Sequence, residues 1–329
     1  MQNQEQKSTS PGVLSTLAAG FDLTAKHPWL LLLPLLVDIF IWLGPRLRFQ
    51  TIIEQLVANL PAEVEVMDIT QQLIELGPMT NLFAVLSVPL IGVPALLAGL
   101  TPETTPLSTE IVDINNGTEW LALIFVLSLA GLLLTAIYYV TISSVVSQRQ
   151  ESANNQTINN WFTRIGASWL RLIGLALLFF ILAFVIYLPI SIVGAVFFLL
   201  NPTLGTIALL LAPFIIIWIA IYLSFAPPGI TLNNLPLFQS VKESLRLVQT
   251  NLPAVLTMLL LIIALGALLD WFLILAENGT WFTLFNILIH AFVITGFVTS
   301  FFILYQDRAA DFSDDEKVLA TDLYNTNIP

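Results

Sequence analysis

Long apolar runs constrain this chain more than any other feature. The clearest extend from Trp120 to Val146 and from Trp281 to Tyr305, and an α-helix of about 20 residues crosses the hydrocarbon core of a bilayer. Charged residues make up only 10% of the chain, whereas a soluble domain carries about 25%. The sequence therefore predicts an all-α fold, a polytopic membrane helical bundle embedded in the cell membrane as a multi-pass protein.

Six segments are expected to span the membrane as three hairpins. They cover approximately residues 29–43, 120–146, 170–188, 204–223, 254–276 and 281–305. A seventh apolar segment, 80–100, contains two prolines and two glycines. If it re-enters without crossing, nine of the eleven basic residues lie on one side, with only Arg46 and Arg48 on the other. Because basic residues concentrate on the cytoplasmic side, this distribution favours six spans with both termini cytoplasmic.

The same assignment divides the chain into three parts. Residues 1–10 are expected to form a disordered tail, 11–305 the membrane domain, and 306–329 an acidic, mobile cytoplasmic tail. Residues 44–118 form an insertion on the outer face, in which we expect two short amphipathic helices near 47–60 and 68–77. No alternation typical of β-strands is evident.

A repeated pattern links the spans. An amphipathic stretch, a polar elbow and a leucine-rich span occur in that order three times, with elbows at His27, at Ala167-Ser168-Trp169 and at Asn251. In the third copy Asn234 is expected to cap the amphipathic helix. Such helices lie on the membrane surface, and five residues are expected to anchor them at the lipid interface: Lys242, Arg246, Arg164, Arg171 and Trp161. Chance recurrence in a six-span protein remains the alternative explanation.

The carboxy-terminal third carries a family resemblance. The sequence from Ala226-Pro227-Pro228 through SVKESLRLVQTNLPAVL to the terminal LYQDR resembles a broad bacterial family of six-span integral membrane proteins. These proteins are related to the membrane domain attached to some glycerophosphoryl diester phosphodiesterases. The resemblance implies a six-span fold in a bacterial plasma membrane. It implies no phosphodiesterase activity, since the soluble phosphodiesterase domain is missing.

Charged residues inside membrane spans are costly and therefore mark candidate functional sites. Asp38 and Asp270 are two such residues, and His290 lies in the last span. If the bundle brings them together, an Asp–His pair could bind a proton or a cation. Alternatively, Asp270 reaches water beside Trp271 and His290 bonds a neighbouring helix. Arg46 or Arg48 could pair with Asp38.

Composition excludes several chemistries. The absence of cysteine and the presence of only two histidines leave no disulfide, haem-attachment or zinc motif. A net charge of −11 argues against nucleic acid as a partner. We therefore expect no cofactor, no metal and no catalytic residue, and partners limited to membrane lipids and other membrane proteins. The leading hypothesis is a non-enzymatic membrane scaffold or accessory subunit. The alternatives are a transporter or permease-like protein with the Asp/His site, and, third, a membrane enzyme.

Overall fold

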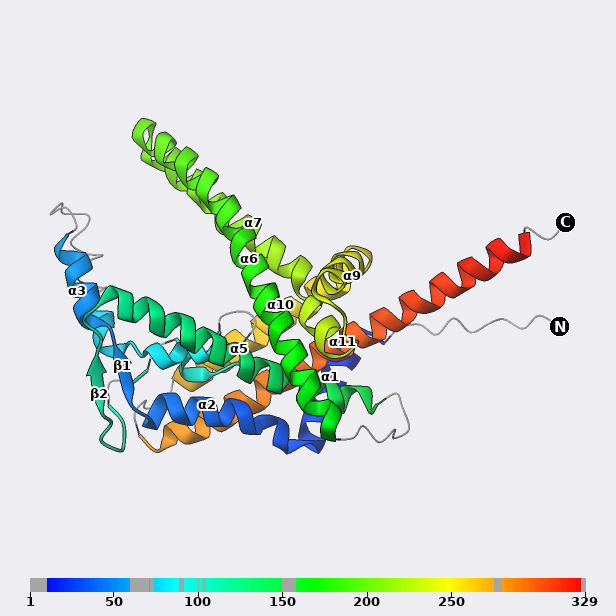
Figure 1. Cartoon of the computed structure of the whole chain (residues 1–329), viewed down its shortest axis with the longest axis horizontal. Helices are drawn as coiled ribbons and strands as arrows, with labels where there is room; N and C mark the ends of the chain where they lie inside the picture. Colours follow the sequence, from blue (N-terminus) through cyan, green and yellow to red (C-terminus); the bar gives the residue numbers. More distant parts are fainter. Residues whose placement is uncertain are drawn as a thin grey trace. The chain divides into compact units, whose positions relative to one another are not determined.

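The computed structural model describes residues 11–59, 71, 74–88, 92–99, 101–102, 104–149, 158–274 and 280–326. At 158–160, 270, 274 and 312–326 it describes the backbone alone. The described chain is almost entirely helical (Figure 1). It forms two compact units. The first unit comprises Met1–Gly20, Ser143–Leu260 and Ser300–Pro329, and the second comprises Phe21–Ile142 and Leu261–Thr299.

Five helices are long and apolar enough to cross a membrane: Gly117–Ser147, Trp161–Leu200, Pro202–Thr231, Leu252–Leu273 and Phe282–Asp311. A bent pair, Val13–Lys26 with Pro28–Leu43, makes a sixth candidate if it is counted as one span. This number, together with the apolar composition, makes the chain a multi-pass membrane protein. The predicted all-α membrane fold is confirmed at this level.

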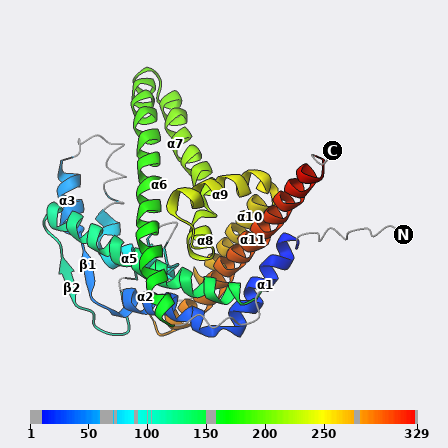
Figure 2. The ribbon, with the colours of Figure 1, turned by 45° about the vertical axis from the view of Figure 1, so that its right-hand side comes forward.

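A long helical hairpin dominates the first unit. Helix α6 (Ile158–Leu200) and helix α7 (Pro202–Leu223) lie side by side in both Figure 1 and Figure 2. Asn201 caps α7, because its side-chain oxygen accepts hydrogen bonds from the backbone N–H groups of Thr203 and Leu204 at 2.9 and 3.4 Å. Gly205 packs so closely against α6 that an added Cβ would lie 2.5 Å from the Cα of Phe198. Small residues allow such close approach between membrane helices.

The second predicted elbow, Ala167-Ser168-Trp169, does not exist. Helix α6 runs through it without interruption and also through Pro189, which was expected to end the span. Ser168 is buried within the first unit. At the breaks at His27 and Asn251 a proline follows within two residues, and proline removes a backbone donor in the first turn of the next helix. The 167–169 segment contains no proline, so nothing in the local chain interrupts the helix.

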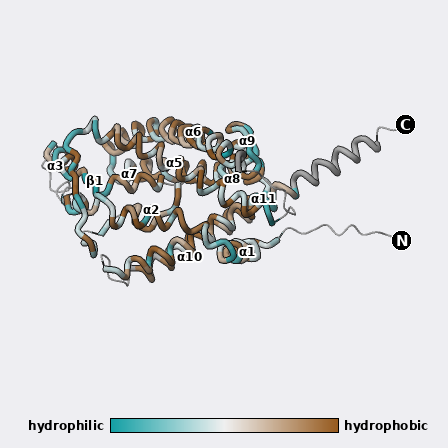
Figure 3. The backbone as a smooth tube through the Cα atoms, turned by 60° about the horizontal axis from the view of Figure 1, so that its bottom comes forward, coloured by the Kyte–Doolittle hydropathy of each residue, from teal (hydrophilic) through white to brown (hydrophobic). Residues whose placement is uncertain are grey.

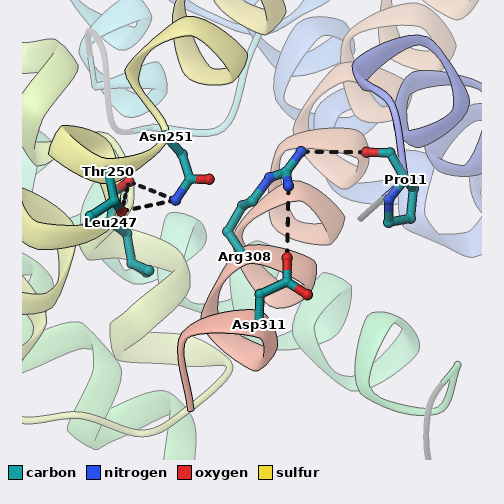
Figure 4. Close-up of polar contacts among 6 residues, drawn as sticks. All are labelled: Pro11, Leu247, Thr250, Asn251, Arg308 and Asp311. Carbon is teal, nitrogen blue, oxygen red and sulfur yellow. Dashed lines mark hydrogen bonds and ion pairs between the residues drawn. The ribbon is translucent and has the colours of Figure 1, made fainter. Parts of the chain in front are cut away.

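The first and third elbows are present. Helix α1 (Val13–Lys26) is followed by a short 3-10 helix, η1 (Pro28–Leu31), and α2 (Leu32–Leu43), and the chain bends by 94° at this break. Asn251 alone separates helix α9 (Leu237–Thr250) from helix α10 (Leu252–Ile274). At that elbow the Asn251 amide donates to the backbone oxygen of Leu247 at 3.1 Å (Figure 4).

The predicted cap of α9 is wrong. Pro236 occupies the N-cap position, and no side chain caps the helix. Asn234 instead adopts a left-handed conformation with φ of 52°, which asparagine tolerates better than most residues. It therefore ends the turn that follows the short helix α8 (Ala226–Thr231). Figure 3 shows that α9 is more hydrophilic than α6 and α7.

The acidic carboxy-terminal segment has a helical backbone as far as residue 326, because helix α11 (Phe282–Thr326) continues into it. Its mobility stays a prediction. The other predicted tail, 1–10, lies outside the described residues.

The second unit holds the insertion. A two-stranded parallel sheet, which the sequence did not indicate, pairs β1 (Arg46–Arg48) with β2 (Ile111–Asp113), residue 46 lying opposite 111. Helix α3 (Gln50–Ala58) confirms the first predicted amphipathic helix. Of the second, near 68–77, only residues 71 and 74–76 are described as helical.

The apolar segment 80–100 is broken, as predicted. Its described residues form two short 3-10 helices, η3 (Leu82–Ser87) and η4 (Leu96–Ala98), preceded by η2 (Gly77–Met79). It packs against α5 (Gly117–Ser147), where an added Cβ on Gly131 would lie 2.6 Å from the Leu86 oxygen. Non-helical backbone of this kind needs protein around it to satisfy its polar groups.

Candidate functional site

Asp38 is buried in the second unit and binds the broken segment 80–100. Its side chain extends from α2 and is fully buried. Its two carboxyl oxygens accept hydrogen bonds from the backbone N–H groups of Leu96 and Leu97, at 3.0 and 2.9 Å. These groups begin η4, whose own N-cap residue, Ala95, provides no side-chain acceptor. The first N–H groups of a helix have no partner within it, so Asp38 caps η4 from another element.

Further side chains form hydrogen bonds within the described part of this segment. Asn81 caps η3 by accepting from the Phe83 N–H at 3.2 Å, and its amide donates to the Ile41 oxygen on α2 at 3.3 Å. The Ser87 hydroxyl donates to the Val93 oxygen at 2.6 Å. These bonds, like those of Asp38, join residues of the broken segment to one another or to α2. The polar groups near α2 are therefore used to fold a non-helical segment within an apolar protein.

The predicted pairing of Asp38 with Arg46 or Arg48 is wrong. The polar partners of the Asp38 carboxyl group among the described residues are the two N–H groups, and neither arginine is among them. Arg46 is buried, and one terminal nitrogen of its guanidinium donates to the Pro102 oxygen. The reason is that the chain becomes extended after Gly44 and continues as β1, so these arginines leave the helix that carries Asp38.

The other two candidate residues of the predicted site lie on other helices. His290 is buried on α11, and it is not a polar partner of Asp38 in the described structure. Asp270 belongs to α10, and its side chain is outside the described residues. The proposed meeting of Asp38 with His290 therefore finds no hydrogen bond or ion pair to support it.

Polar bonds between helices are frequent elsewhere in the second unit. The Tyr138 hydroxyl on α5 donates to the Thr295 hydroxyl on α11 at 3.0 Å, and the hydroxyls of Thr24 and Thr299 lie 3.3 Å apart. Phe21 packs edge-on against Phe297 with ring centroids 5.5 Å apart. Buried hydroxyls of this kind join membrane helices. These contacts show that the helices of the second unit pack directly against one another.

In the first unit, two serines hold α9 against the chain that precedes it. The buried Ser240 hydroxyl donates to the Ala226 oxygen at 2.7 Å. The buried Ser244 hydroxyl donates to the Tyr222 oxygen at 2.7 Å and accepts from the Phe225 N–H at 3.1 Å. Each bond satisfies a backbone group where α7 ends and α8 begins. The sequence signal was a pair of serines four residues apart, which places both on one helical face.

A tyrosine from α11 completes this attachment. The Tyr305 hydroxyl, almost completely buried, donates to a Glu243 carboxylate oxygen on α9 at 2.5 Å. It also accepts from the Asn233 amide at 2.8 Å. The bond to a charged acceptor is short, as such bonds are. The sequence showed a tyrosine near the end of the last span but gave no sign that it would bind Glu243.

The five predicted interface residues lie in three different environments. Arg164 donates to the Thr231 oxygen at 3.0 Å, and Arg171 donates to the backbone and side-chain oxygens of Asn234 at 2.9 and 2.5 Å. Both arginines therefore bind the loop around α8. Lys242 and Arg246 are exposed on α9. Trp161 is half-buried and contacts Phe162, which is exposed.

At the elbow after α9, the described contacts are local. Figure 4 shows the Asn251 amide donating to the Leu247 oxygen and to the Thr250 hydroxyl. The same view shows Arg308 on α11, which donates to the Pro11 oxygen at 3.4 Å and forms an ion pair with Asp311 at 3.7 Å. Throughout the part of the chain that the structure describes, no three His, Cys, Asp or Glu residues gather in an arrangement that could hold a metal ion.

Comparison of the chain with protein-family models, with curated proteins and with solved structures finds no match.

Proposed function

We propose that this protein is a non-enzymatic membrane scaffold or accessory subunit that acts through contacts with lipid and with other membrane proteins. The observation that supports this proposal is the use of Asp38. Its carboxyl group is fully buried, and both oxygens hold backbone N–H groups of η4. Buried polar groups are generally hydrogen-bonded, and the two bonds of Asp38 favour a role in folding the segment.

The proposal extends to topology. Six spans in three hairpins, with both termini in the cytoplasm, place nine of eleven basic residues on the cytoplasmic side, as membrane proteins generally do. The resemblance to the six-span bacterial family belongs to the same proposal. The short, broken segment 80–100 agrees with it, because no described part of that segment forms a helix long enough to cross.

A transporter working through Asp38 would need that side chain to exchange its partners. Releasing Leu96 and Leu97 would leave two buried N–H groups without acceptors, at about 1–3 kcal/mol each. A transport cycle would have to supply this free energy at every turnover. We therefore favour the scaffold over the transporter.

The test is a flux measurement in proteoliposomes. Purified protein is reconstituted with a pH-sensitive dye inside the vesicles, and proton or cation gradients are applied. We expect flux equal to that of protein-free vesicles, for both the wild type and Asp38→Ala. Protein-dependent flux that Asp38→Ala abolishes would overturn the proposal in favour of a transporter.

Topology is tested separately, and the absence of natural cysteine makes this simple. Glu110→Cys places a single thiol at the exposed residue just before β2. Gln249→Cys places one at an exposed position of α9. An impermeant maleimide added outside sealed cells should label the first and spare the second. Labelling of both from one side would rule out the six-span arrangement.

A further inference from the structure

Helix α9 presents two different faces along its length. One faces the protein and consists of the buried residues Ser240, Ser244, Leu247 and Val248. The opposite side is exposed and contains Phe238, Lys242, Leu245 and Arg246. A spacing of three or four residues puts Phe238, Lys242 and Leu245 in one stripe, with Arg246 beside it. Apolar and basic side chains thus alternate on the surface that the protein leaves uncovered.

This orientation is fixed by bonds on the other side of the helix. Ser240 and Ser244 bind backbone oxygens at the end of α7 and the start of α8, and Glu243 binds the Tyr305 hydroxyl. A rotation of α9 that buried Phe238 would break all three. The large exposed fractions of Phe238 (79%) and Leu245 (38%) therefore belong to the folded protein.

The charge of the exposed side is positive. Glu243 is the one acidic residue in the α9 sequence, and its carboxylate is bound to Tyr305. Lys242 and Arg246 carry two positive charges on the uncovered side. Basic side chains next to exposed apolar ones are typical of helices that lie in the membrane interface.

The position of α9 in the chain agrees with such a location. Only Asn251 separates it from α10, which is apolar enough to cross a membrane. The carboxyl end of α9 must therefore lie near the depth at which α10 enters the bilayer. At that depth aromatic and aliphatic side chains reach the acyl boundary while basic groups remain among the headgroups.

We propose that the exposed side of α9 binds anionic phospholipid headgroups, with Phe238 and Leu245 entering the acyl boundary and Lys242 and Arg246 pairing with lipid phosphates. This inference rests on the proposed function and names the lipid class for it. A basic residue near an anionic surface contributes about a fivefold preference, so two contribute roughly thirtyfold. Salt weakens this preference because it screens exposed charges.

The experiment uses the full chain with one introduced thiol, Phe238→Cys, labelled with bimane and reconstituted into phosphatidylcholine vesicles. Trace doxyl-labelled phosphatidylglycerol or doxyl-labelled phosphatidylcholine is then added. We expect the anionic quencher to be enriched near the probe by about ten- to thirtyfold over the zwitterionic one. The preference should fall as salt is raised from 50 to 500 mM.

Charge variants decide whether α9 causes the preference. Lys242→Gln with Arg246→Gln should abolish it, whereas Lys242→Arg with Arg246→Lys should retain it. Lys26→Gln is the control, because it removes one positive charge from an exposed lysine outside α9 that is paired with Asp22 at 2.6 Å. The control should leave quenching unchanged.

Two results would overturn the proposal. One is equal quenching by both lipids. The other is a probe that aqueous iodide quenches and neither lipid does, since α9 would then face water or a protein partner. Failure here is distinguishable from failure of the scaffold, because the scaffold is tested by whether any protein-dependent flux occurs in proteoliposomes, and that readout does not involve the lipid preference of α9.

Discussion

Asp38 should behave as a structural clamp whose removal loosens the broken segment. Asn retains one acceptor oxygen and places an NH₂ group where the second oxygen stood. One of the two bonds, 2.9 and 3.0 Å in length, is then lost, and a buried N–H faces a donor. An unsatisfied buried N–H costs about 1–3 kcal/mol. We expect Asp38→Asn to lower the free energy of opening by about 2 kcal/mol and Asp38→Ala, which removes both acceptors, by about 4 kcal/mol.

The assay reports local opening directly. Val93 is fully buried within the segment, and Val93→Cys introduces the sole thiol of the chain with little change in volume. Maleimide labelling of this thiol in detergent occurs when the segment opens. Since 1.4 kcal/mol corresponds to a factor of ten, a loss of about 2 kcal/mol raises the labelling rate about thirtyfold.

The matched control is Asp22→Asn, which makes the same chemical change at an exposed residue of α1 that pairs, among the described residues, with exposed Lys26. Exposed pairs four residues apart on a helix contribute about 0.3–0.5 kcal/mol, so the labelling rate at position 93 should change by no more than about twofold. Equal labelling rates in Asp38→Asn and the Asp22→Asn control would refute the clamp.

Three further substitutions test the packing of the first unit, each by unfolding in detergent with denaturant. Tyr305→Phe removes the bonds to Glu243 and Asn233 and should cost about 2 kcal/mol; Tyr222→Phe, on a half-buried tyrosine, is the control and should cost less than about 0.5 kcal/mol. Ser244→Ala leaves two backbone groups at the α7–α8 junction without their partner and should cost about 2 kcal/mol, so an unchanged midpoint would contradict its assigned role. Gly205→Ala should force the α6–α7 hairpin apart at about 1–3 kcal/mol, whereas Gly266→Ala, with open space around its Cβ, should stabilise α10 by up to about 1 kcal/mol.

Helix breaks show how far local sequence predicts this fold. The breaks at His27 and Asn251 were predicted, and each is followed within two residues by a proline. The break at Ala167–Trp169 was predicted from the repeat alone, and α6 is continuous there. The repeat was inferred from the other two copies, whereas a helix breaks only where its own residues disfavour it. Residues 167–169 include no proline, so every backbone N–H donor of the helix is kept there.

The candidate site shows the opposite limit. The sequence indicated that Asp38 was unusual, because an acidic residue in an apolar segment needs a partner. It did not identify the partner, since backbone N–H groups 58 and 59 residues away carry no signature in the side-chain pattern. The nearby arginines were the obvious choice, and the turn into β1 carries them elsewhere.

The sequence by itself determined the membrane class, the long helices and the two proline-marked elbows, because hydropathy and missing backbone donors act locally. Tertiary structure decided what the polar residues do. Asp38 caps η4, Arg171 binds Asn234, and Tyr305 orients α9 through Glu243. Each of these bonds joins elements distant in sequence, so each depends on the packing that brings the two groups together. That packing, through α9, also left Lys242 and Arg246 on the exposed side.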